Sequence, residues 1–120
     1  MSIKALRGAD QLTADDRSEM LEAVKDLLQQ MMERNNLAVS DLISVFFTST
    51  PDLVSEFPAV AARELGMGEV PLMCSVEIDV TGALPRVVRV MMHANSPLAT
   101  SEIKHIYIRG AEVLRRDLAQ

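Results

Sequence analysis

Three residues that could take part in chemistry lie close together in the segment 71–92. Cys74 is the single cysteine of the chain, Glu77 follows three residues later, and Arg89 stands in an apolar run of valines and methionines. A guanidinium keeps its proton in proteins, so an arginine in an apolar strand must find an anion. A structural ion pair with Glu77 or Asp79 would supply one, and so would an anionic ligand. The residues alone leave these two alternatives open.

The composition limits what such a site could bind. The chain has 120 residues, enough for one domain with a single hydrophobic core, and we expect that domain to span 1–120. Its net charge is −5, which argues against nucleic acid as a partner. An anion-binding site would therefore be a local arginine cluster against an acidic background. Because only four residues are aromatic (three Phe and one Tyr), the core must consist of aliphatic side chains and the eight Met.

The same sequence indicates a compartment. One cysteine excludes an internal disulfide framework and is compatible with a reducing cytoplasm. The N-terminal segment lacks the apolar stretch of a signal peptide. No apolar run approaches the roughly 20 residues of a membrane span. We therefore expect a soluble, cytoplasmic protein with no membrane partner.

The elements that must position these residues begin with a strand and a long helix. Residues 2–7 alternate as a strand would, with Arg7 at its end and Gly8 allowing a turn. Thr13 followed by Asp16 resembles a capping box, so a helix is predicted from about 14 to 34. Asparagines 35 and 36 would terminate it. Its apolar stripe consists of Met20, Leu21, Val24, Leu27, Leu28, Met31 and Met32.

The middle of the chain predicts a strand and a second, short helix. After a turn at 39–41, residues 42–48 are typical of a buried strand, because they are β-branched, aromatic and bounded by polar residues. A loop over 50–56 should lead to a helix that starts at Pro58 and is ended by glycines 66 and 68.

Three further strands complete the predicted fold. The first starts near Val70, and an ideal strand would put Cys74 and Glu77 on opposite faces because their separation is odd. After Pro85 a strand should place Arg89 on one face with alternate neighbours, and the last strand should cover 103–108. The expected fold class is α+β, a single domain with a mixed sheet and one long helix packed on it.

We find no pattern for a metal or cofactor site. No second histidine or cysteine stands at metal-site spacing from Cys74, and His93 is better explained as a satisfied strand-end histidine than as a ligand. No histidine near Cys74 in the sequence could serve as its base, so Cys74 is poorly suited to be a nucleophile.

Four segments carry a resemblance to a known family. They are RGA at 7–9, TPDLVSEFPAVAAREL at 50–65, VPLMCSVEIDVTGALPRVVRVMMH at 70–93 and HIYIRGAEVLRRDL at 105–118. Together they resemble the small AroH-type chorismate mutases, in the order and close to the spacing of that family. The resemblance implies a chorismate-mutase-like homotrimer (a pseudo α/β barrel) with a site at each subunit interface. It also implies chorismate as the substrate, prephenate as the product, and no cofactor or metal.

The resemblance also implies roles for individual residues. Arg89 would lie against the ether oxygen of the substrate, Glu77 would accept from its hydroxyl, and Arg7 and Tyr107 would hold carboxylates. Cys74 would lie beside Glu77 as a contact. Further substrate contacts would come from Phe57, Ala59, Arg63, Met73, Leu114 and Arg115. The chain departs from the family at Val60, where many relatives have lysine, and at Arg116, where many have proline.

Two other functions remain compatible with these residues. Small trimeric enamine/imine deaminases share this general fold and place an arginine, and often a cysteine, in an interface pocket. A non-catalytic trimer that binds carboxylates would need only the Arg/Tyr cluster. The TGALP-x-x-VRVMM pattern and the pair Glu77/Arg89 favour the mutase.

Overall fold

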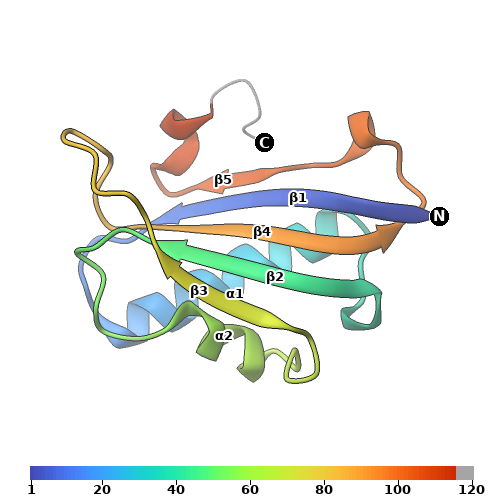
Figure 1. The fold of residues 1–120 in the computed structure, drawn as a ribbon, viewed down its shortest axis with the longest axis horizontal. Helices are drawn as coiled ribbons and strands as arrows, with labels where there is room; N and C mark the ends of the chain where they lie inside the picture. Colours follow the sequence, from blue (N-terminus) through green and yellow to red (C-terminus); the bar gives the residue numbers. More distant parts are fainter. Residues whose placement is uncertain (116–120) are drawn as a thin grey trace.

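The computed structural model describes residues 1–115 and shows a five-stranded mixed sheet with both α-helices on one face (Figure 1). The strand order is β3-β2-β4-β1-β5. The central strand β4 runs antiparallel to β1 and β2, whereas the outer pairs β1/β5 and β2/β3 are parallel. The strands are β1 Ser2–Gln11, β2 Leu42–Ser49, β3 Leu72–Val76, β4 Val87–Ser96 and β5 Ile106–Ile108. The predicted α+β class with a mixed sheet is confirmed.

The helices are α1, Arg17–Arg34, and the short α2, Pro58–Glu64. Single 3₁₀ turns within the described residues are η1 Val39–Asp41, η2 Thr100–Glu102 and η3 Ala111–Leu114. Because both α-helices lie behind the sheet in Figure 1, its other face is left open in the single chain. This asymmetry decides where a ligand could reach the sheet.

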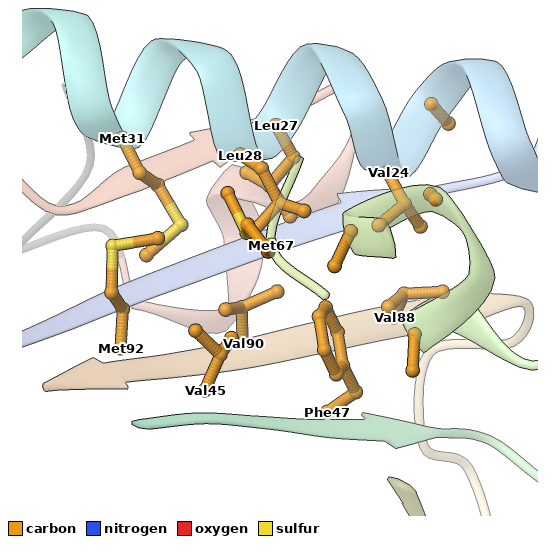
Figure 2. Close-up of a cluster of buried hydrophobic side chains, with 14 of the residues drawn as sticks. Val24, Leu27, Leu28, Met31, Val45, Phe47, Met67, Val88, Val90 and Met92 are labelled. Carbon is orange, nitrogen blue, oxygen red and sulfur yellow. The ribbon is translucent and has the colours of Figure 1, made fainter. Parts of the chain in front are cut away.

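The core lies between α1 and the sheet (Figure 2). As predicted, it consists of aliphatic side chains and methionines, and the α1 stripe is buried except for the half-buried Met32. Each fully buried side chain of this kind contributes about 1.5–3 kcal/mol. Across from the stripe, the sheet presents Val45, Phe47, Val88, Val90 and Met92.

The start of α1 differs from the prediction. The N-cap is Asp16 and not Thr13, because the Asp16 carboxylate accepts the Glu19 backbone N–H at 2.9 Å. The Glu19 carboxylate reaches back to the Thr13 backbone N–H at 2.6 Å and to its hydroxyl at 2.8 Å. These hydrogen bonds lower the pKa of Glu19. Thr13 is therefore fixed to the first turn without beginning the helix.

The predicted turn at Gly8 was wrong, because β1 continues through it to Gln11. A Cβ on Gly8 would lie 2.5 Å from Met31 Sδ and 3.2 Å from Leu27 Cδ1 of α1. Glycine at this position therefore allows α1 to approach β1 closely.

Two strands differ from the prediction, β2 in its burial and the last strand in its length. The prediction that β2 is buried was wrong for one side of the strand: Val45 and Phe47 are buried, but Phe46 is exposed on the open face. Ile43 is also exposed, at the point where the register with β4 shifts. The last strand begins at Ile106 and not at 103. Instead of strand pairing, the Lys104 backbone N–H and carbonyl bond the side chain of Asn35, at 2.8 and 2.9 Å.

Candidate active site

Alternation along β4 places Arg89 on the open face of the sheet. Val88 and Val90 point to the helices and are buried, whereas Arg89 and Met91 are only partly buried. The predicted division of this strand into two faces is thus confirmed. Although its neighbours in the sequence are apolar, 43% of the Arg89 side chain is exposed in the single chain.

Arg89 forms an ion pair that does not satisfy it. Its Nε lies 3.3 Å from Glu77 Oε1, close enough for an ion pair. However, the N–H is not aligned with the carboxylate, so the buried Nε has no hydrogen-bond partner among the described residues. The Thr48 hydroxyl donates to the same Oε1. Of the two sources of an anion expected for Arg89, Glu77 is present, and the side chain is exposed enough in the single chain for a ligand to reach it as well.

These side chains line a hollow of about 280 Å³ on the open face, here called the face hollow. It brings together five of the predicted site residues, from β1, β4, β5 and the segments after β3 and η3. Three arginines and one glutamate give it a charge of about +2 in a chain with net charge −5. Such a hollow favours an anion with more than one negative group. Its lining is Arg7, Gly8, Phe46, Thr48, Glu77, Arg89, Val90, Met91, Tyr107 and Arg115.

Neighbouring groups fix Arg7 and Tyr107. The Arg7 backbone N–H donates to His105 Nδ1 at 2.9 Å, in the place where a backbone carbonyl would continue the ladder. This nitrogen must be unprotonated to accept. Burial, followed by the positive charge of Arg7, lowers the pKa of His105. Tyr107 is only 4% exposed because it packs in a small cluster with Ala9, Ala111 and Leu114.

A second hollow of about 320 Å³, the edge hollow, lies between β3 and the loop that leads to α2. Asp15 holds this loop by accepting the backbone N–H groups of Val54 and Ser55, both at 3.0 Å. An ion pair between Arg17 and Glu56 at 3.0 Å adds a second link to the start of α1. The lining is Ser49, Leu53, Val54, Ser55, Glu56, Phe57, Pro58, Cys74, Ser75 and Val76.

Cys74 and Glu77 belong to different hollows of one chain. Cys74 packs against the main core, on the helix side of β3, whereas Glu77 meets Thr48 and Arg89 on the open face. The odd spacing therefore predicted their opposite faces correctly. The expectation that Cys74 lies beside Glu77 in one pocket is not met within a single chain, because no bulge or turn separates them before β3 ends at Val76.

Four predicted contact residues line neither hollow. Arg63 is exposed on α2, Met73 is exposed on the open face, Ala59 is buried in the core, and Leu114 packs beside Tyr107. Val60 is partly buried against the core. Arg116 lies outside the described residues.

Sequence reasoning missed Phe46 and Thr48 in the face hollow. Period-two alternation along β2 could have placed both on the face opposite Val45 and Phe47. Among residues 1–115, no group of three or more His, Cys, Asp or Glu is arranged to hold a metal ion. No helix in that part of the chain is long and apolar enough to cross a membrane.

This combination of fold and site is that of a chorismate mutase, and comparison with known proteins defines the family. The family model for chorismate mutase type I matches residues 3–118. The chain belongs to this family.

Individual relatives agree with this assignment. The chain is 39% identical to the chorismate mutase AroH of Bacillus subtilis (strain 168), over 99% of this chain and 94% of the relative. It is 40% identical to the chorismate mutase AroH of Thermus thermophilus, over 97% and 96% of the two chains. A solved structure of the chorismate mutase from Clostridium thermocellum superimposes with a TM-score of 0.90 at 44% identity. That match covers 92% of this chain and 98% of the solved one.

Proposed function

We propose that this protein is an isomerase that rearranges chorismate to prephenate, in the biosynthesis of aromatic amino acids. The observation that carries the proposal is the face hollow, where three arginines surround one glutamate in an otherwise acidic chain. Chorismate is a dianion, and its rearrangement breaks the ether bond as a carbon–carbon bond forms. The step needs no nucleophile, metal or proton transfer. It needs a site that holds the reactive conformer and stabilises the developing charges.

Arg89 is the residue that we propose to act on the ether oxygen, where negative charge develops. The Arg89 side chain lines the face hollow and 43% of it is exposed, so its outer guanidinium N–H groups can reach a bound substrate. Glu77 would face the ring, where positive charge develops, and accept from the substrate hydroxyl. The Thr48 hydroxyl and Arg89 both contact Oε1 of this carboxylate and orient it.

Arg7, Tyr107 and Arg115 would bind the two carboxylates of the substrate. A planar guanidinium matches a carboxylate in two parallel hydrogen bonds, and the phenol adds one donor. The three residues come from β1, β5 and the position after η3, so they line the part of the face hollow nearer to the β5 edge of the sheet. Glu77 and Arg89 line the part nearer to the β3 edge.

We further propose a homotrimer with each site at a subunit interface. Ligand pockets in proteins usually have volumes of about 300–1,000 Å³, and each hollow alone is close to the lower bound. The two hollows lie on different sides of the sheet, so only a neighbouring chain could bring its Phe57 and Cys74 to the Glu77 of this one. Exposed apolar side chains on the open face and the β3–β4 connection supply a surface for association. They are Ile3, Phe46, Met73, Ile78 and Val80.

Incubation with chorismate tests the activity and separates the three candidate functions. A mutase converts it to prephenate, with loss of the ultraviolet absorbance of its diene. An enamine/imine deaminase releases ammonia from its own substrates and leaves chorismate unchanged, while a carboxylate binder binds it without consuming it. Full recovery of chorismate after incubation with folded protein would exclude the mutase.

Mixing of inactive variants tests the shared site. Arg89→Ala affects the face hollow and Phe57→Ala the edge hollow, so mixed trimers should contain wild-type sites, about a quarter of the total on random mixing. The matched control mixes Arg7→Ala with Glu77→Ala. Because both residues line the face hollow of one chain, this mixture should regain nothing. Recovery in the control, or none in the test, would contradict the shared site.

The remaining proposals concern the chain as a whole. We propose that residues 1–120 form one catalytic domain that acts in the cytoplasm without a cofactor. The single cysteine supports a reducing compartment. Turnover that survives extensive dialysis against a chelator is the expected result, and dependence on added metal would contradict the proposal.

A further inference from the structure

A buried ion pair fastens the C-terminal part of the fold on the face away from the face hollow. Asp10 of β1 is fully buried and points to the helix side. Arg109 directly follows β5 and binds this carboxylate with two hydrogen bonds, from Nε at 2.9 Å and from Nη2 at 2.7 Å. Nη2 also lies 2.8 Å from Asp26 Oδ2 of α1. Arg109 thus links the end of the sheet to the long helix, and we call this group the Arg109 clamp.

Besides the clamp, the segment is held by one short strand pairing and by the buried side chains of Ile106, Tyr107 and Ala111. Strand β5 has only three residues, and it pairs with β1 alone, at the edge of the sheet. After it the chain reverses through Arg109, at φ 54°, and Gly110, at φ 102°. The left-handed region is unfavourable for an arginine, so the surrounding contacts must hold it there.

The fastened segment carries residues of the proposed site. Tyr107 is two residues before Arg109, and Arg115 directly follows η3, and both line the face hollow. Leu114 packs with Tyr107 over Ala9, on the face of β1 opposite to Asp10. A change at Arg109, on the helix side of the sheet, would therefore alter how Tyr107 and Arg115 are held on the open face.

We propose that Asp10 and Asp26 act through Arg109 as positioning residues, which hold β5 and η3 so that Tyr107 and Arg115 can bind the carboxylates of the substrate. The consequence for substrate binding rests on the proposed function. The fastening of β5 and η3 does not. None of the three clamp residues lines the face hollow, so their effect on the substrate would be indirect.

The charges of the clamp depend on one another. Burial raises the pKa of the Asp10 carboxyl even though Arg109 opposes the shift, because a fully buried carboxylate loses its water. The hydrogen bond from Arg109 to Asp10 raises the pKa of the guanidinium, nearly half of which remains exposed to water. Removing Arg109 alone would leave the carboxylate buried without its partner.

The test combines chorismate kinetics with hydrogen exchange of the peptides that cover 106–115. Arg109→Ala should raise the KM for chorismate at least tenfold per folded subunit and speed exchange in these peptides but not in α1. Arg109→Lys should recover part of both effects, since it keeps the charge but not the two-pronged contact. Lys25→Gln, which removes a surface ion pair with Glu64, is the matched control and should change neither.

A second variant covers the case in which Arg109→Ala does not fold. The double variant Asp10→Asn/Arg109→Gln leaves no buried charge and should show the same rise in KM and the same local exchange. Unchanged KM in the folded variants would overturn the positioning role, whatever happens to their melting temperature. Turnover by the wild type is measured first. If it is absent, the proposed function fails, and exchange over 106–115 still decides whether the clamp holds the segment.

Discussion

The two faces of β4 divide the molecule into a part that folds it and a part that meets a ligand. Toward the helices the strand presents Val88, Val90 and Met92, all buried in the core. Toward the open side it presents Arg89 and Met91, both only partly buried. Residues that are neighbours in the sequence thus belong to different environments. The position of a residue in this alternation should decide whether its substitution affects stability or turnover.

Replacing Arg89 should give the largest loss of turnover with the smallest change in stability. Arg89→Ala should lower kcat a hundredfold to a thousandfold or more, since loss of one donor to developing charge costs about 3–4 kcal/mol in other enzymes. Stability should change little, because the side chain is partly exposed and lies outside the core. Arg89→Lys should also be severely impaired, because it gives up the planar fork. The measurement is kcat per folded subunit beside the melting temperature, and near-normal turnover of the Lys variant would remove Arg89 from the mechanism.

Met92, three residues later on the other face, should give the opposite result. Met92→Ala removes a fully buried side chain, so it should lower the free energy of unfolding by about 3 kcal/mol. The folded fraction should keep its kcat. Urea unfolding and turnover at saturating chorismate check the two parts. A large loss of kcat in folded protein would show that the two faces are not independent.

Gly8 tests a place where the faces meet, since it lines the face hollow and also lies under α1. Gly8→Ala should destabilise the fold by about 1 kcal/mol, because the new methyl meets Met31 Sδ, the flexible end of a side chain that can shift. Thermal unfolding measures this cost. The companion variant Gly8→Ala/Met31→Ala opens space for the methyl. The two changes should therefore cost less together than the sum of their separate effects.

A smaller difference between stability and turnover should appear in their dependence on pH. The folded-state pKa of His105 lies below its ordinary value of 6.5, so the folded state prefers the neutral ring. His105 therefore contributes stability that is present above pH 6.5 and is lost as pH falls through its folded-state pKa. Turnover involves no proton transfer, so kcat should stay nearly flat between about pH 6 and 9. His105→Gln should weaken the acid loss of stability, and an unchanged profile would count against this assignment.

Cys74 should give the smallest effect. It packs against the core and lines the edge hollow, and we assign it a contact role only. Cys74→Ser and Cys74→Ala should keep substantial activity. Complete loss of turnover in folded protein would instead support a covalent role for the thiol.

Local patterns in the sequence predicted most of the fold, because each depends on near neighbours. The stripe of α1 and the alternation of β4 are examples, since period and burial are properties of a single element. The error at Gly8 had a different origin. Glycine is typical of a turn, but here a helix from further along the chain required its small size, and no local pattern reports such a contact.

The grouping of the site residues was harder to predict from the sequence than the fold was. Resemblance to the family supplied five of the face-hollow residues, but not their grouping. That Arg7 and Glu77 line one hollow, and that Cys74 lines another, follows from strand order and from which face the helices cover. Arg109 had no signal at all, because its carboxylate partner is 99 residues away in the sequence.

The short strands β3 and β5 at the two edges of the sheet have a consequence for solubility. A long, regular edge offers unpaired backbone groups to other sheets and invites aggregation. Here the edge strands β3 and β5 have only five and three residues, and residues 2–7 of β1 extend beyond the pairing with β5. Such short edges offer few sites for the uncontrolled addition of further strands.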